Sequence, residues 1–145
     1  MPSLIARTIG GAAVALAATL SIGCGDDTTS PTSTTLTTTT EVYTGTMTVG
    51  GSGFYSFSVG GPGAALITFG SLTDASTGRP LNVAMGLGVG IPAGEGCNVS
   101  MSATAAPALT AQITSPVLPG IYCVQLSDVG NLRVSAVFGV RIVHQ

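Results

Sequence analysis

Hydrophobic and polar side chains alternate with a period of two along most of the chain. Within one short run, Tyr55, Phe57 and Val59 alternate with Ser56 and Ser58. Such alternation predicts β-strands that bury one face and expose the other. Eight runs of this kind lie at residues 43–49, 55–59, 65–72, 83–89, 99–103, 109–113, 122–126 and 134–142.

Clusters of glycine, proline, asparagine and aspartate separate these runs and predict turns. They lie at residues 50–53, 60–63, 77–80, 90–96, 116–120 and 128–131. Strands of this length with turns about 10–15 residues apart are typical of antiparallel sandwiches. We therefore expect residues 41–145 to form an all-β domain, an antiparallel β-sandwich or jelly roll of about eight strands.

The N-terminal segment has a different pattern. Arg7 is followed by a predominantly apolar run of 14 residues, from Ile9 to Ile22. A membrane-spanning helix needs about 20 apolar residues, whereas the apolar part of a signal peptide needs about 7–15. The run therefore predicts a signal peptide at residues 1–23, and a buried core helix is the alternative.

The residues that end this run, Leu20 to Cys24, resemble the lipobox of bacterial lipoproteins. Gly23 and Cys24 fit that pattern, while Ser21 stands where it prefers leucine. The resemblance implies a lipid on Cys24 that anchors the chain to a membrane of the bacterial cell envelope, on its extracytoplasmic side. Ordinary cleavage that leaves a free cysteine is the alternative.

The number of cysteines is consistent with a lipid anchor on one of them. If Cys24 carries lipid, Cys97 and Cys123 remain as an even pair. An exported protein enters an oxidising compartment in which a disulfide persists. We expect a Cys97–Cys123 disulfide, with two free buried thiols as the alternative and a metal site from two cysteines as a remote one.

Residues 24–40 are rich in threonine and serine. Nine of the 13 residues from Thr28 to Thr40 are threonine, and no apolar residues alternate with them. This composition predicts a disordered linker between the lipidated cysteine and the domain. Because threonine also favours strands, a β-strand is the alternative.

Composition excludes several classes of function. Only 7% of the residues are charged, the net charge is −2, and arginine supplies all four basic side chains. Nucleic-acid binding needs a basic surface that this chain cannot build. The single histidine, His144, is expected at an exposed, frayed terminus, which leaves no basis for a histidine zinc site or a Ser-His-Asp triad. We expect no enzyme activity and no cofactor.

Few acidic side chains remain as candidates for a site. Asp128 and Asn131 are weak candidates for calcium ligands, but calcium prefers six to eight oxygens. The favoured alternative is that Asp128 caps a turn in which Asn131 is left-handed beside Gly130. A glycosidase pair would require Asp74 and Glu95 to face each other across a cleft.

Three tyrosines, Tyr43, Tyr55 and Tyr122, could form a platform that stacks on sugars. Each one lies in phase with the apolar residues of its strand, so we expect all three to pack against the core instead. The remaining arginines are expected at the solvated surface: Arg79, Arg133 and Arg141.

Two segments resemble bacterial pre-peptidase C-terminal domains. Val49–Val59 is similar to their opening strands, and Pro119–Leu126 is similar to their late strand, in which a Gly-x-Tyr turn precedes alternating apolar residues. The following Asp128–Leu132 is similar to small bacterial lipoproteins with a Thr/Pro linker. The resemblance implies a β-sandwich accessory module, in some members linked to calcium or polymer binding. Pro80–Met85 replaces the acidic strand of that family, which argues against calcium.

These observations favour a cell-envelope lipoprotein that presents a non-catalytic β-sandwich for binding or surface structure. The expected partners are the membrane, through the lipid on Cys24, and an unidentified envelope protein or polysaccharide. The alternatives are a carbohydrate- or calcium-binding accessory module and, more remotely, a secreted hydrolase.

Overall fold

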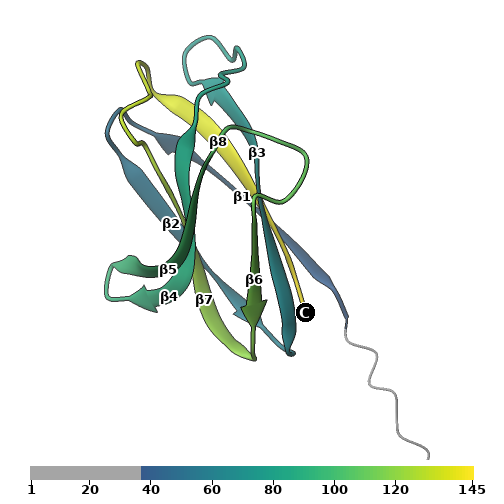
Figure 1. The fold of residues 1–145 in the computed structure, drawn as a ribbon. Helices are drawn as coiled ribbons and strands as arrows, with labels where there is room; N and C mark the ends of the chain where they lie inside the picture. The colour runs from purple at the N-terminus through teal and green to yellow at the C-terminus, as the bar shows by residue number, and fades with distance from the viewer. Residues whose placement is uncertain (1–36) are drawn as a thin grey trace, which may run out of the picture. The chain divides into compact units, whose positions relative to one another are not determined.

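The computed structural model describes residues 37–145, which form an all-β domain of eight strands in two four-stranded antiparallel sheets (Figure 1). The predicted fold class is therefore confirmed. The strands are β1 (Thr39–Met47), β2 (Ser52–Val59), β3 (Gly63–Asp74), β4 (Met85–Ala93), β5 (Gly96–Ala105), β6 (Ile113–Val117), β7 (Gly120–Ser127) and β8 (Ala136–His144). Within these residues, no helix is long and apolar enough to cross a membrane.

The strand order is that of a jelly roll. One sheet has the order β1-β8-β3-β6 and the other has the order β2-β7-β4-β5. The pairs β1–β8, β2–β7, β3–β6 and β4–β5 are nested, as if one long hairpin had been rolled into two layers. This topology places the first and last strands side by side, with Thr39 opposite His144.

The core lies between the two sheets. It is built from every second residue of each strand, the one whose side chain points inward. Ile67 and Phe69 of β3 are fully buried, as are Leu87 and Val89 of β4, whereas the outward Leu66 is 40% exposed. Burial of such side chains stabilises the fold by about 1.5–3 kcal/mol each. The period-two pattern therefore predicts which face of each strand is buried.

One predicted strand is displaced. The run at residues 109–113 was expected to be a strand, but Leu109 lies in a loop and is 90% exposed. The strand is β6, and it includes Pro116, which the sequence pattern assigns to a turn. Since β6 lies at the edge of its sheet, a residue without an N–H group is tolerated there.

The N-terminal boundary of the domain also differs from the prediction. β1 begins at Thr39, because Thr39 and Thr40 pair with His144 and Val143 of β8. The last two residues assigned to the linker therefore belong to the sheet. The predicted signal peptide, the lipidation site Cys24 and the linker up to residue 36 lie outside the described residues.

Candidate functional site

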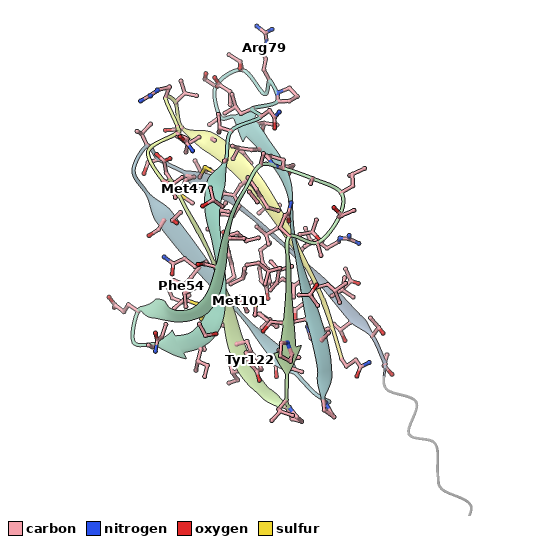
Figure 2. All side chains as sticks on the ribbon, viewed as in Figure 1. Met47, Phe54, Arg79, Met101 and Tyr122 are labelled. Carbon is pink, nitrogen blue, oxygen red and sulfur yellow. A yellow bond between two sulfur atoms is a disulfide. The ribbon has the colours of Figure 1, made fainter. Side chains whose placement is uncertain are left out.

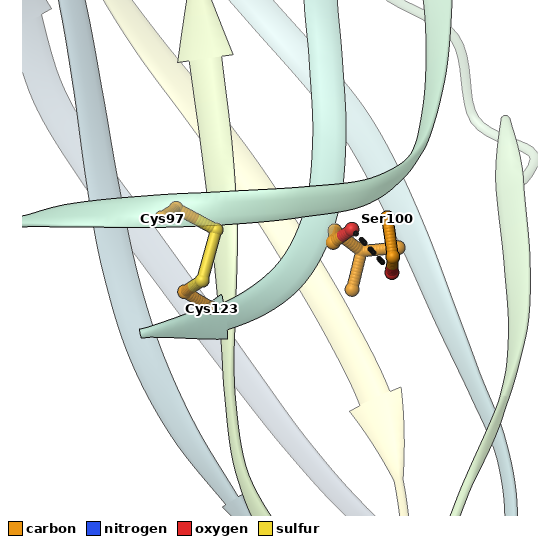
Figure 3. The surroundings of a disulfide bond; sticks show 4 residues. Cys97, Ser100 and Cys123 are labelled. Atoms are coloured by element: carbon orange, nitrogen blue, oxygen red, sulfur yellow. Dashed lines mark hydrogen bonds between the residues drawn. A yellow bond between two sulfur atoms is a disulfide. The ribbon is translucent and has the colours of Figure 1, made fainter. Parts of the chain in front are cut away.

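The predicted disulfide is present and joins Cys97 of β5 to Cys123 of β7, with a Cα–Cα distance of 5.8 Å (Figure 3). These strands are not neighbours, because β4 lies between them in the sheet. Strands two positions apart in a flat sheet are separated by about 9.5 Å. Because Cys97 still pairs with Pro92 of β4, the end of the β4–β5 hairpin must bend toward β7.

Gly90 of β4 makes this close approach possible. It pairs with Cys123 on one side and with Val99 on the other, at a β-bulge that follows Val89. A Cβ atom at Gly90 would lie 1.9 Å from the carbonyl oxygen of Asn98. Only glycine fits at this position, so the turn predicted to begin at residue 90 is instead a bulge within the β4–β5 hairpin, and β4 continues to Ala93.

Two further glycines leave the outer face of β4 hollow. A Cβ at Gly88 would lie 2.7 Å from a methyl group of Val99, and one at Gly86 would lie 2.6 Å from the hydroxyl of Ser127. An open groove of about 410 Å³ runs over these glycines, and Gln125 also lines it. The groove presents amide, hydroxyl and apolar groups but no charge, so it suits neutral polar ligands such as sugar hydroxyls or peptide amides.

A second hollow of about 480 Å³ lies on the outer face of the β1-β8-β3-β6 sheet. Val42 and Leu109 give it an apolar wall, and Arg141 is the charged side chain that lines it. As predicted, the three arginines of the domain are all exposed: Arg79, Arg133 and Arg141. Arg79 lies at the tip of the β3–β4 loop (Figure 2).

Asp128 caps the loop that follows β7. Its Oδ2 accepts a hydrogen bond from the backbone N–H of Gly50 at 2.8 Å. Its Oδ1 accepts three more, from the N–H groups of Gly130, Asn131 and Leu132 at 2.8–3.1 Å. Gly50 belongs to the β1–β2 turn, so the carboxylate ties two loops together. The predicted cap by the Asp128 side chain is confirmed.

These hydrogen bonds lower the pKa of Asp128, and the bond from Gly50 has the largest effect. The neighbouring Asn131 does not point toward Asp128, because its Nδ2 donates to the carbonyl of Ala84 at 2.8 Å. Gly130 in this loop has a positive φ of 90°. Among residues 37–145, no three acidic, histidine or cysteine side chains gather where they could hold a metal ion.

Asp74 and Glu95 do not form a carboxylate pair. Asp74 ends β3 and accepts hydrogen bonds from Ser76 and Thr77, which lower its pKa. Glu95 lies in the β4–β5 turn, at the opposite end of the sandwich (Figure 1). Glycosidase carboxylates lie about 5–9.5 Å apart, so this pair cannot perform that chemistry.

The expectation for His144 is wrong. The residue ends β8, and its exposed fraction is 3% because β8 pairs with β1 as far as Thr39. Its Nε2 lies 2.8 Å from the Glu41 carboxylate, and its Nδ1 lies 3.2 Å from the carbonyl oxygen of Gln145. The ring also packs 5.3 Å from Phe57 of the other sheet.

Tyr43 extends this cluster. Its hydroxyl donates to the Glu41 carboxylate and also lies 2.9 Å from the carbonyl oxygen of Ser56. Burial has the largest effect on the pKa of Tyr43 and, together with the hydrogen bond and the charge of Glu41, raises it to about 12. Sequence reasoning missed this Glu41–Tyr43–His144 cluster, although residues 41 and 43 lie on the same side of one strand.

The three tyrosines pack against the core, as predicted. The rings of Tyr43 and Tyr55 stack with their centroids 4.8 Å apart. The ring of Tyr122 stacks on Phe57, and its hydroxyl accepts a hydrogen bond from the N–H of Leu118 at 3.0 Å.

A comparison with protein-family models finds no match for this chain, and a comparison with curated proteins finds no similar sequence.

Proposed function

We propose that this chain is a lipoprotein of the bacterial cell envelope. A lipid on Cys24 anchors it to the membrane on the extracytoplasmic side. The threonine-rich segment connects that anchor to the β-sandwich, which acts as a binding or structural module rather than as an enzyme.

The pairing of cysteines is the observation that carries this proposal. The chain has three cysteines, and two of them form the disulfide between β5 and β7. Disulfides persist in exported proteins, which supports an extracytoplasmic location. The cysteine that remains, Cys24, stands at the end of the apolar run in the lipobox-like Leu20–Cys24. One cysteine is thus available for the lipid without a leftover thiol in the domain.

Two features of the domain support a binding or structural role. The single histidine has Glu41 and a backbone carbonyl as partners of its two ring nitrogens, so it stabilises the junction of β1 and β8. The groove over β4 offers uncharged hydrogen-bonding groups beside apolar ones. Such a surface suits an envelope polysaccharide or an extended peptide of an envelope protein.

The experiment is a Cys24→Ala substitution, followed by membrane fractionation and mass spectrometry of the mature protein. We expect the wild type in the membrane fraction with an acylated N-terminal Cys24, and the variant outside it. The matched control is a Cys97→Ala/Cys123→Ala variant, which removes the other two cysteines and should stay with the membrane. An unmodified Cys24, or a mature chain that starts elsewhere, would overturn the proposal.

A further inference from the structure

His144, the only histidine of the chain, is buried where β8 ends and β1 begins. Its side chain is 2% exposed, and its ring centroid lies 5.3 Å from that of Phe57 in the other sheet. A buried polar ring is costly unless both of its nitrogens have hydrogen-bonding partners. The atoms around the ring therefore decide which protons it carries.

Both ring nitrogens of His144 face oxygen atoms. Nε2 lies 2.8 Å from Oε1 of Glu41, and Nδ1 lies 3.2 Å from the backbone oxygen of Gln145. The same backbone oxygen accepts hydrogen bonds from the N–H groups of Gly60 and Gly61 at 2.8 and 3.4 Å. A neutral imidazole has one donor and one acceptor nitrogen, whereas the doubly protonated ring has two donors. Only the doubly protonated ring donates to both oxygens.

Glu41 offers a carboxylate to this ring. Its side chain is 31% exposed, and its second oxygen, Oε2, accepts a hydrogen bond from the hydroxyl of Tyr43. A carboxyl group that accepts at both oxygens does so in its ionised form. The hydrogen bond from Nε2 of His144 is then charge-assisted, which makes it about twice as strong as a neutral one.

The other strands around the ring contribute no charge to this cluster. β2, β6 and β7 contain no charged residue, and Asp74 lies at the far end of β3. Arg141 of β8 lines the hollow on the outer face of its sheet, whereas His144 lies on the inner face. Among the described residues, the titratable partners of His144 in this cluster are therefore Glu41 and Tyr43.

An open hollow of about 410 Å³ adjoins the ring. Thr39, Ser58 and Gln145 line it together with His144. Because the hollow brings water close to the ring, a proton can leave or return without unfolding of the sandwich.

We propose that His144 is a pH-operated clasp for the first residues of β1. In its doubly protonated form the ring binds Glu41 and holds residues 39–41 against β8. Loss of one proton leaves a ring nitrogen whose lone pair faces an oxygen, so one of the two contacts is lost. Since β1 is an edge strand, only β8 pairs with these residues in the sheet, and they loosen when the contact is lost.

The opening is confined to the start of β1. Tyr43 stacks on Tyr55 of β2, and the hydroxyl of Tyr55 donates to the carbonyl oxygen of Thr44 at 3.1 Å. These contacts hold the strand beyond Glu41 in either state of the ring. The clasp needs no lipid on Cys24, so it stands independently of the function proposed above.

The test is NMR spectroscopy of the full chain, with its disulfide formed, from about pH 5 to about pH 9, which spans the titration of histidine. The nitrogen chemical shifts of the ring report its protons. Amide exchange, corrected for the intrinsic rate at each pH, reports the protection of residues 39–42. We expect two protonated ring nitrogens at the acidic end, and a fall in this protection of about tenfold or more as the ring loses a proton. Protection in β3 should stay constant.

Three variants separate the clasp from a general effect of pH. His144→Gln should remove the pH dependence at residues 39–42. Glu41→Gln keeps an acceptor oxygen but removes the negative charge at a partly exposed position, so it should fold and show weaker protection there at the acidic end. Glu95→Gln is the matched control, because Glu95 lies in the β4–β5 turn, and it should behave like the wild type.

Three results would overturn the proposal. They are a ring that carries a single proton throughout the range, protection at residues 39–42 that does not follow the titration of the ring, and an unchanged pH dependence in His144→Gln.

Discussion

Replacement of Gly90 by alanine tests how the disulfide shapes the β2-β7-β4-β5 sheet. The added Cβ would lie 1.9 Å from the carbonyl oxygen of Asn98, 2.7 Å from its carbonyl carbon and 2.8 Å from the Cα of Val99. Real Cβ contacts stay above 3.0 Å, so the backbone of β5 must retreat by about 1 Å. Cys97 precedes Asn98 in the chain, and its disulfide to Cys123 resists that movement.

We expect Gly90→Ala to lower the free energy of unfolding by about 3 kcal/mol, at the upper end of typical overpacking costs. For a domain of this size that corresponds to a fall in Tm of about 12 °C. The assay is urea unfolding of the full chain, followed by far-UV circular dichroism. Gly53→Ala in β2 is the control, since no atom lies within 4 Å of the added Cβ, and its stability should be unchanged or slightly higher.

The same substitution in a Cys97→Ala/Cys123→Ala background isolates the role of the disulfide. Without the covalent bond β5 can move away from β4, so the cost of Gly90→Ala should fall by about 1 kcal/mol or more. The reasoning would be refuted if Gly90→Ala were as stable as the wild type, or if its cost were equal in both backgrounds.

Three further measurements test the remaining features. Loss of the Cys97–Cys123 disulfide, which closes a loop with a sequence separation of 26, should cost about 3.5 kcal/mol in urea unfolding against the wild type. Replacing a chelator with calcium should shift Tm by less than about 2 °C, because both oxygens of Asp128 already accept hydrogen bonds from N–H groups. A large shift that disappears in Asp128→Ala would reveal a calcium site. In an absorbance titration one tyrosine should ionise near pH 12, a step absent from Tyr43→Phe and moved to lower pH by Glu41→Gln.

The two pKa directions also predict opposite effects of pH on stability. Hydrogen bonds lower the folded-state pKa of Asp128, so its stabilisation is present above the unfolded pKa and is lost as the pH falls through the folded value. Tyr43 has a raised pKa, so its contribution is complete below pH 10 and is lost as the pH rises toward 12. Tm should therefore fall at both extremes, with Tyr43→Phe less sensitive at the alkaline one.

Period-two alternation predicted the sandwich because it reports burial directly. Ile67 and Phe69 are buried and Leu66 is exposed, as their phase requires. The pattern was wrong at residues 109–113, where it placed a strand too early in the chain. Leu109 lies in phase with Ile113, but it is exposed in the loop before β6. That strand begins only at Ile113 and continues through Pro116.

The disulfide and the Asp128 cap could be predicted from the sequence. The burial of His144 was missed, although the sequence pattern contains a signal for it. Counting cysteines predicted the disulfide, and turn chemistry predicted the cap at Asp128. His144 continues the alternating series of Val140 and Ile142 by one more step. Its partner Glu41 could not be identified, because strand pairing 103 residues apart is a property of the topology.

The bulge at Gly90 explains why side chains on both faces of β5 are exposed. Sequence alternation places Val99, Met101 and Ala103 on one face, yet Val99 lies over Gly88 on the outer side while Met101 pairs with Val89 on the inner side. The extra residue at the bulge changes the phase, and the disulfide holds the bent end of the β4–β5 hairpin close to β7. The strand therefore gives up burial on both faces between Asn98 and Ser102. The disulfide offsets this loss of burial, because closing the loop between Cys97 and Cys123 stabilises the fold by about 3.5 kcal/mol.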